Sequence, residues 1–267
     1  MLKVDNLTKV FNKNTINEKK ALDQVSLHLS PGDFVTIIGS NGAGKSSLMN
    51  AVAGVFIPDS GEVVIDGINI TNWAPHKRAG LISRVFQDPM SGTAASMTIE
   101  ENLIMALKRG KKRSLRWALN KSKREYFCSE LEKLGLGLEN RLTTKVKLLS
   151  GGQRQALTLL MATLEEPKLL LLDEHTAALD PKTADKVIEL TCRVAESSQL
   201  TTMMITHNLE QALSCGNRTI MMHEGRIILD IKGTERSNMT ISRLLEMFNK
   251  ASGVQMNNDR MMLAGTL

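Results

Sequence analysis

The sequence is poor in aromatic residues and in long apolar runs, and its cysteines are few. Phe, Tyr and Trp make up only 3% of the 267 residues, so an exposed aromatic side chain becomes a candidate for recognition. The three cysteines, Cys128, Cys192 and Cys215, lack metal-type spacing, so no zinc site is indicated. No apolar run approaches the roughly 20 residues that cross a bilayer. No apolar leader follows Met1. We therefore expect a soluble chain that would need a partner for any role at a membrane.

Positive charge is concentrated in one segment. The chain has 34 basic and 28 acidic residues. Lys108–Arg124 holds nine of the basic residues and no acidic one, so the rest of the chain carries a small net negative charge. The segment is either a solvated helix face and loop or a contact for anionic lipid headgroups or an acidic partner. Nucleic acid is a weaker alternative, because Trp117 is the only aromatic residue there that could stack on bases.

A glycine-rich stretch carries the most specific local signal. It has the pattern G-x-x-x-x-G-K-[ST], follows the apolar, β-branched run Phe34–Ile38 and precedes the helical pattern Ser46–Val55. Glycines let the backbone approach phosphate and the helix offers its positive end. Lys45 supplies a point charge for the β- and γ-phosphates, and the Ser46 hydroxyl can ligate Mg²⁺. The residues concerned are Gly39, Ser40, Asn41, Gly42, Ala43, Gly44, Lys45, Ser46 and Ser47. The alternative is a plain glycine-rich turn.

The N-terminal part is expected to be partly antiparallel. Val4–Val10 and Ala21–Leu29 have strand patterns, and Glu62–Ile65 and Ile68–Ile70 flank a hairpin turn. Phe11 follows the first strand, where a flat ring could stack on an adenine base. The alternative is an ordinary core phenylalanine.

Polar side chains follow three later strands. Gln87 follows the strand Leu81–Phe86 and is a candidate ligand for Mg²⁺ or for an attacking water. Asp173 and Glu174 follow four buried leucines, where Asp173 can hold the metal and Glu174 can accept a proton from the water. His207 follows Thr201–Thr206, and the carboxyl edge of a parallel sheet is where such a side chain can reach a γ-phosphate.

A second anion site is expected at a helix start. Ser150 is a good N-cap for the helical run that follows, and Gly151 and Gly152 leave backbone N–H groups uncovered before Gln153. A plainly capped helix would not need two adjacent glycines.

The order of these features resembles the ATP-binding subunit of an ABC transporter, over nearly the whole chain. The resemblance is carried by the phosphate loop, Gln87, the LSGGQ stretch, the apolar strand ending in Asp173-Glu174, and His207. It implies that Asp180 belongs to the D-loop, that Phe11 stacks on adenine, and that Gln87 also couples to a membrane subunit. It also implies that Ser150, Gly151, Gly152 and Gln153 contact ATP held by another subunit.

The resemblance also sets the fold, ligands and partners. It implies an α/β P-loop NTPase core, with a RecA-like mixed sheet and an antiparallel β part, plus an inserted α-helical subdomain. The expected divisions are 1–89 and 150–231 for the core, 90–149 for the helical subdomain, and 232–267 for a short helix and a flexible tail. ATP and Mg²⁺ are the implied cofactors. The implied partners are a second ATPase subunit, identical or different and paired head to tail, an integral membrane permease and a solute-binding protein. No nucleic acid is expected, and the implied location is the cytoplasmic face of the cell membrane.

Two further details bear on function. His175 stands where the family usually has proline after the catalytic glutamate, which removes no catalytic group. The stretch GTAASMTIEENL, Gly92–Leu103, resembles ATPases of the branched-chain amino acid and simple sugar permease group, and within it those assigned to aromatic amino acid uptake. Import is favoured. The alternatives are an exporter ATPase, a soluble ABC-type ATPase acting on ribosomes or DNA, and a non-catalytic regulatory cassette, which the presence of Lys45, Glu174 and His207 disfavours.

Overall fold

The computed structural model describes residues 1–111 and 119–253 and divides the chain into two compact units. The first unit comprises 1–78 and 199–253, and the second comprises 79–198. Within the described residues, no helix is both long and apolar enough to span a membrane. The expected boundaries of the ATPase core and the helical subdomain, at residues 89, 149 and 231, stay a prediction.

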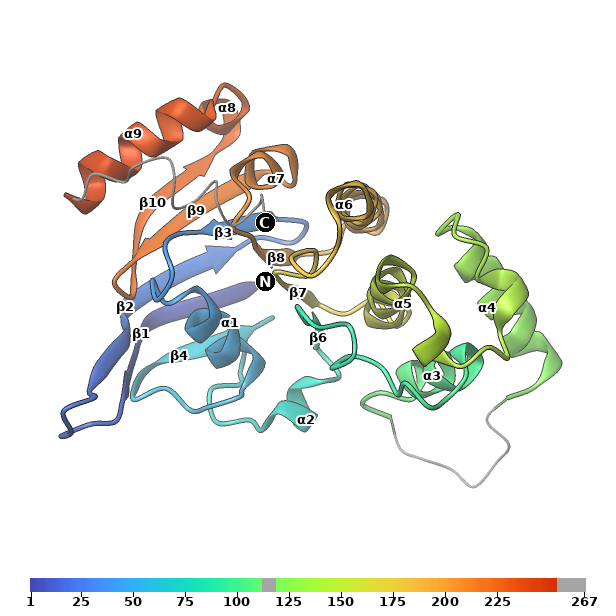
Figure 1. The fold of residues 1–267 in the computed structure, drawn as a ribbon. Coiled ribbons are helices and arrows are strands. Elements are labelled where there is room, and N and C mark those ends of the chain that lie inside the picture. Colours follow the sequence, from blue (N-terminus) through green and yellow to red (C-terminus); the bar gives the residue numbers. More distant parts are fainter. Residues whose placement is uncertain (112–118, 254–267) are drawn as a thin grey trace. The chain divides into compact units, whose positions relative to one another are not determined.

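The first unit contains two sheets and five helices. Its strands are β1 (Leu2–Phe11), β2 (Lys19–Leu29), β3 (Phe34–Ile38), β4 (Ser60–Ile65), β5 (Ile68–Asn69), β8 (Thr202–Ile205), β9 (Arg218–His223) and β10 (Arg226–Lys232). Its helices are α1 (Lys45–Ala53), α2 (Pro75–Arg78), α7 (Leu209–Ser214), α8 (Gly233–Ser237) and α9 (Ile241–Ser252). Figure 1 shows β1 and β2 as two long neighbouring strands, with α8 and α9 beside β10.

The two sheets of this unit differ in strand direction. One has the order β2-β1-β4-β5 with every pair antiparallel, as the hairpin patterns predict. In the other, the order β10-β9-β3-β8 combines parallel pairs on both sides of β3 with the antiparallel hairpin β9–β10. All five residues of β3 are buried, and strands pair with it on both sides. The sheet is therefore mixed, and β3 lies in its interior.

A buried arginine anchors the C-terminal end of α1. The Arg78 side chain is 1% exposed and donates hydrogen bonds to the carbonyl oxygens of Ala51, Val52, Thr71 and Trp73. Burial lowers the pKa of Arg78 to about 10, so the guanidinium stays charged at neutral pH. Gly54 caps α1 with a φ of 80°, and a methyl group there would meet Arg78 Nε at 2.5 Å. The guanidinium thus donates hydrogen bonds to carbonyl oxygens that the end of α1 leaves without helical partners.

The second unit is mainly helical. Its strands β6 (Ile82–Val85) and β7 (Leu169–Asp173) pair in parallel. Its α-helices are α3 (Ile99–Leu107), α4 (Lys121–Glu132), α5 (Gly151–Thr163) and α6 (Pro181–Ser197), and η1 (Glu139–Arg141) and η2 (Val146–Leu148) are short 3-10 turns. α3 begins with a capping box formed by Thr98 and Glu101.

Candidate functional site

Backbone contacts fix the glycine-rich loop between β3 and α1. Gly39, Gly42 and Gly44 all have positive φ, at 145°, 79° and 102°. A methyl group at Gly39 would lie 2.2 Å from the carbonyl oxygen of Met222, and one at Gly44 would lie 2.6 Å from that of Ala21. Glycine is thus required at both positions because β9 and β2 approach the loop with their own backbones.

Lys45 lies against this loop. Lys45 is only 5% exposed, and its Nζ donates hydrogen bonds to the carbonyl oxygens of Gly39 at 2.7 Å and Ser40 at 3.1 Å. α1 begins after Gly44, which has no side chain to cap the N–H groups of the first turn. Ser46 in that turn is exposed. The loop therefore presents a cation, a hydroxyl and helix N–H groups together, a combination suited to phosphate.

The structure places His207 at the same sheet edge as the loop. β8 is parallel to β3, with Ile205 in register with Ile37. Gly39 and His207 each lie two residues beyond this register pair, at the carboxyl edge of the sheet. His207 is half-buried. The predicted arrangement of the loop and this histidine at one edge is observed.

Phe11, at the end of β1, is half-buried and packs against a second aromatic ring. Its ring centroid lies 5.3 Å from that of Phe56, with the rings nearly perpendicular at 85°. Lys9 Nζ lies 5.7 Å from the Phe11 centroid and 5.4 Å from the Phe56 centroid. Phe11 is therefore oriented by an edge-to-face contact, and its stacking on adenine stays a prediction.

In the second unit, the candidate polar residues gather at the carboxyl edge of β6 and β7. Val85 is in register with Leu172, so Gln87 lies at the same edge as Asp173 and Glu174. Gln87 is exposed. The two strand ends thus place an amide and two carboxylates at one edge of the sheet.

Arg84 is a site residue that the sequence reasoning missed. Its Nη2 lies 2.5 Å from Oδ2 of Asp173, and its guanidinium lies 4.9 Å from the centre of the Phe86 ring. Both charged side chains are 16% exposed. The sequence does contain a signal for this contact. Arg84 is a basic residue inside the otherwise uncharged strand Ile82–Val85, and a charge in such a strand needs a partner.

Glu174 has a strained backbone. Its φ is 46°, in the left-handed region that residues other than glycine rarely occupy. Its carbonyl oxygen accepts a hydrogen bond from Ala177 N at 3.0 Å, which closes the turn after β7. Strain of this kind costs roughly 1–3 kcal/mol and clusters at functional positions, which agrees with a chemical role for this carboxylate.

His175 is buried and uncharged. It is 2% exposed, and its Nε2 lies 3.0 Å from Oγ1 of Thr191 on α6. The Thr191 hydroxyl donates to the carbonyl oxygen of Val187 at 2.7 Å, so Nε2 of His175 must be the donor in its own hydrogen bond. Burial lowers the pKa of His175 to about 4. The residue therefore joins the turn after β7 to α6 as a neutral imidazole.

The start of α5 combines capping with close packing. Ser150 and Gln153 form a capping box, in which Gln153 N donates to Ser150 Oγ and Ser150 N donates to Gln153 Oε1. Gly152 is buried, and a methyl group there would lie 2.2 Å from Cγ2 of Thr183. Gly151 is exposed, and a methyl group there would meet Leu179 at 3.2 Å. Packing against Thr183 therefore explains Gly152, whereas Gly151 leaves the helix start open on the solvent side.

Asp180 caps α6. Its carboxylate accepts a hydrogen bond from Thr183 N at 3.1 Å, and Pro181 follows at the first helical position. Hydrogen bonds from the Thr183 side chain and backbone hold the pKa of Asp180 below its usual range. Asp180 thus orders the segment between Glu174 and α6.

The donor chemistry of these residues fits Mg²⁺. The Ser46 hydroxyl, the Gln87 amide and the Asp173 carboxylate are hard oxygen donors of the kind this ion prefers. Asp173 is paired with the Arg84 guanidinium through one carboxylate oxygen, Oδ2.

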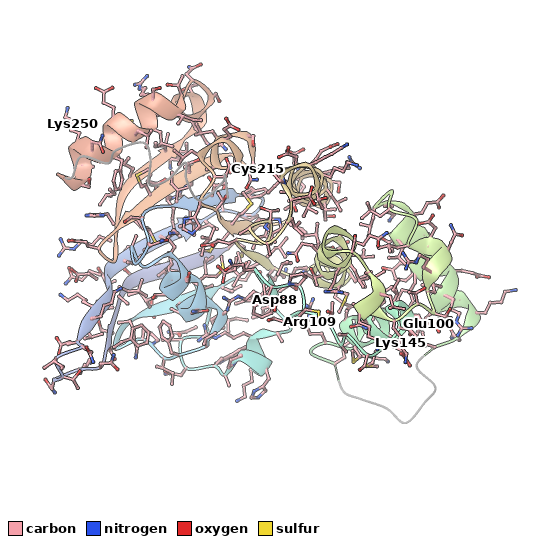
Figure 2. All side chains as sticks on the ribbon, in the orientation of Figure 1. Asp88, Glu100, Arg109, Lys145, Cys215 and Lys250 are labelled. Atoms are coloured by element: carbon pink, nitrogen blue, oxygen red, sulfur yellow. The ribbon has the colours of Figure 1, made fainter. Side chains whose placement is uncertain are left out.

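The basic segment is partly described. Residues 112–118 lie outside the described part. Arg109 donates to the carbonyl oxygen of Ala162, Lys111 forms an ion pair with Glu165, and Arg124 forms a bidentate pair with Glu100 at 2.7 and 2.9 Å. Glu100 and Arg109 are labelled in Figure 2. The charge of the segment is therefore partly neutralised within the second unit.

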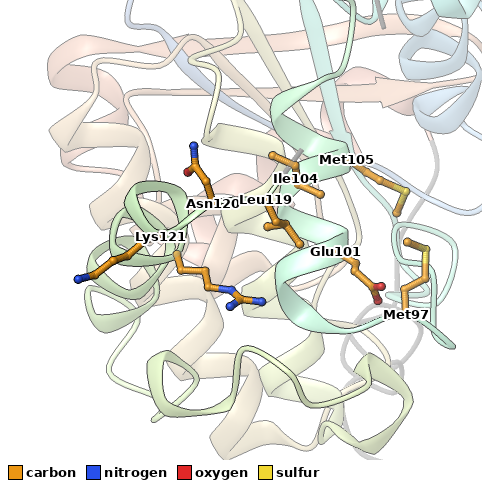
Figure 3. A pocket seen from close by; sticks show the side chains of 8 residues that line it. Met97, Glu101, Ile104, Met105, Leu119, Asn120 and Lys121 are labelled. Carbon is orange, nitrogen blue, oxygen red and sulfur yellow. The ribbon is translucent and has the colours of Figure 1, made fainter. Parts of the chain in front are cut away.

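A pocket of about 540 Å³ lies between α3 and the start of α4. Figure 3 shows the side chains that line it: Met97, Glu101, Ile104, Met105, Leu119, Asn120, Lys121 and Arg124. Apolar side chains form part of its wall, and Glu101, Lys121 and Arg124 add charge. Met105 is 43% exposed. The pocket therefore offers an apolar surface with a charged border.

Comparison with known proteins gives consistent matches. Residues 22–177 match the sequence profile of the family described as ABC transporter. The tyrosine transport ATP-binding protein of Clostridioides difficile (strain R20291) is 47% identical over 251 residues, 94% of this chain and 100% of that protein. The methionine import ATP-binding protein MetN of Bartonella henselae is 32% identical, over 86% of this chain and 67% of that protein.

Solved structures agree. A dimeric ATP-binding cassette in a post-hydrolysis state, bound to ADP and Pi, matches with a TM-score of 0.72 at 30% identity, covering 87% of this chain and 98% of the other. An ATP-binding cassette of an ABC transporter in its ADP conformation matches with a TM-score of 0.75 at 28% identity, covering 93% and 98%. The expected P-loop NTPase fold with an antiparallel part is confirmed.

Proposed function

We propose, from the premise that this chain belongs to the ABC transporter family of ATP-binding proteins, that it hydrolyses ATP to drive uptake of an aromatic amino acid through a membrane permease. The observation that carries this proposal is the 47% identity to a tyrosine transport ATP-binding protein along that protein's whole length. The 32% identity to a methionine import protein supports amino acid import as the wider class.

The first unit binds the nucleotide. Gly39–Ser47 surrounds the phosphates with backbone N–H groups, and Lys45 exchanges its two loop carbonyl partners for phosphate oxygens. Phe11 stacks on the adenine ring, and His207 reaches the γ-phosphate. The support for these roles is the common sheet edge of the loop and His207 and the fixed orientation of Phe11.

The second unit supplies the groups for hydrolysis. Glu174 accepts the proton of the attacking water, and Gln87 orients that water. Ser46, Asp173 and Gln87 would hold Mg²⁺, which would supply positive charge against the phosphates. Asp180 orders the turn that carries Glu174. The support is the placement of Gln87, Asp173 and Glu174 at one edge of β6 and β7.

Two such subunits act as a head-to-tail dimer, identical or paired with a related chain. The start of α5, with Ser150, Gly151, Gly152 and Gln153, contacts ATP held by the other subunit. The open solvent side of Gly151 supports this role. The dimeric ATP-binding cassette among the structural matches supports the assembly.

The subunit attaches to the cytoplasmic face of the cell membrane through an integral permease, and a solute-binding protein delivers the amino acid. The pocket between α3 and α4 supports docking of the permease on this part of the second unit, because it offers apolar side chains next to charged ones. Part of the basic segment 108–124 lies beside this pocket and would face anionic lipid headgroups.

Purification of the chain from its native membrane tests the proposal directly. We expect an integral permease and a solute-binding protein to co-purify, and tyrosine to stimulate ATP hydrolysis of the complex in liposomes more than leucine does. A permease without a binding protein would indicate export. Co-purification of ribosomes or DNA without a permease would contradict the proposal.

A further inference from the structure

Lys19, at the start of β2, lies directly opposite Phe11. The two residues are partners in the antiparallel pairing of β1 and β2. Directly opposed residues of such a pair project from the same face of the sheet, with Cβ atoms about 5 Å apart. Lys19 is exposed. Its stem therefore extends on the face that carries the Phe11 ring.

The Lys19 ammonium group lies over the glycine-rich loop. A methyl group added at Gly42 would lie 3.2 Å from Lys19 Nζ. Gly42 is an exposed residue of the loop with a φ of 79°. Lys45, in contrast, reaches the carbonyl oxygens of Gly39 and Ser40. Two lysines from different elements thus approach the same loop at different points.

Lys19 differs from its neighbouring lysines in its partners. Lys9 and Lys13 each lie 3.3 Å from Asp59, and Lys20 lies 3.4 Å from Asp23. Among residues 1–111 and 119–253, Lys19 has no carboxylate within 4.0 Å. Its charge beside the loop is therefore available to an anion.

We propose that Lys19 is a nucleotide-binding residue that contacts the α-phosphate end of the polyphosphate, between the adenine at Phe11 and the loop at Gly42. The inference rests on the proposed roles of Phe11 and the loop. A cation held between the base site and the phosphate site meets the phosphate next to the ribose first. Lys45 remains the contact for the β- and γ-phosphates.

Binding of ATP, ADP and adenosine to the purified full chain and its Lys19→Met variant tests this role. Methionine keeps the unbranched stem and removes the charge. We expect the dissociation constants for ATP and ADP to rise alike, by roughly three- to tenfold, as for loss of one charge-assisted contact, and the constant for adenosine to stay unchanged. The affinity for ATP should also depend less on salt. Lys19→Arg should restore most of the ATP affinity.

Lys20→Met is the matched control, because Lys20 is the next residue of β2 and projects from the opposite face. It should bind all three ligands as the natural chain does. Equal ATP affinity in Lys19→Met and Lys20→Met overturns the role of Lys19, and so does a loss confined to ATP, which would place the contact at the γ-phosphate. Failure of the natural chain to bind ATP would instead overturn the nucleotide site itself.

Discussion

The two units hold their candidate site residues by different means. In the first unit, the backbones of β9 and β2 approach Gly39 and Gly44 so closely that a side chain cannot be added. In the second unit, side chains hold the candidate residues in place. Arg84 forms an ion pair with Asp173, Gln153 and Ser150 cap each other, and Thr183 packs on Gly152.

The difference predicts two kinds of sensitivity to substitution. A backbone contact cannot be relieved by changing the neighbouring residue, because every residue has the same carbonyl group. A side-chain contact can be relieved by a compensating change. A second substitution should therefore not rescue a change at Gly39 or Gly44 in the first unit. In the second unit, a compensating substitution of the contacting side chain should restore stability.

The largest effect is expected at Glu174. Glu174→Gln removes a proton acceptor and should lower the rate of ATP hydrolysis by ~10²–10⁴-fold, as loss of a general base does. ATP affinity should be preserved, because Glu174 is proposed to act on the attacking water and glutamine keeps its size. Steady-state hydrolysis and nucleotide titration measure the two properties. Glu166→Gln is the control, since Glu166 also has a positive φ, of 40°, in the same unit. A turnover of Glu174→Gln within a few-fold of the natural chain would show that another residue accepts the proton.

Gly39→Ala tests the backbone contact in the first unit. The added methyl would lie 2.2 Å from the carbonyl oxygen of Met222 at a φ of 145°. Overpacking and backbone strain together should reduce the free energy of unfolding by roughly 3–5 kcal/mol. Urea unfolding without nucleotide measures this. Gly42→Ala has similar backbone strain but meets only the flexible end of Lys19, so it should cost about 1 kcal/mol. Equal costs for the two variants would contradict the backbone argument.

Gly152→Ala tests the side-chain contact in the second unit. Its methyl would lie 2.2 Å from Cγ2 of Thr183, so it should cost roughly 1–3 kcal/mol of unfolding free energy. Thr183→Ser in the same chain removes Cγ2 and keeps the backbone N–H that Asp180 caps, so it should recover most of the loss. Gly151→Ala should cost less, because Leu179 can move. If Thr183→Ser gives no recovery, the contact is not the cause.

The smallest effect is a pH dependence from His175. Its pKa is about 4 in the folded chain and 6.5 in the unfolded chain, so the folded state resists protonation. The contribution is complete above pH 6.5 and is lost as the pH falls toward 4, which amounts to about 1.4 kcal/mol between pH 7.5 and pH 5.5. Comparing urea unfolding of the natural chain and His175→Gln at both pH values isolates the contribution of His175 to the free energy of unfolding. Identical pH dependence in both proteins would place the imidazole outside the core.

The local elements were largely predictable from the sequence. β3, β7 and the capped start of α5 were expected from apolar runs and a capping serine, and the structure confirms them. The short helix expected within 232–267 is α9, Ile241–Ser252. The common edge of Gly39 and His207 was also expected, because carboxyl ends of parallel strands meet.

Contacts between distant residues were not predictable. Arg84 with Asp173, His175 with Thr191, Phe11 with Phe56, and Lys19 with Gly42 each join residues that the sequence separates. No periodicity or spacing identifies such pairs, because they depend on which strand lies beside which. The glycine pair at 151 and 152 shows the same limit: it was interpreted only as an anion site, but packing on Thr183 requires one of its members.

Arg78 has a consequence for the opposite end of α1. Its guanidinium lies among the carbonyl oxygens at the helix C-terminus, where the helix macrodipole is negative. An incoming polyphosphate meets the positive end of the same dipole at Gly44–Ser46. The peptide groups set the direction of the helix field, and the buried Arg78 charge offsets its negative end. The positive end at the phosphate site is therefore fixed before a ligand arrives, so the site is electrostatically preorganised.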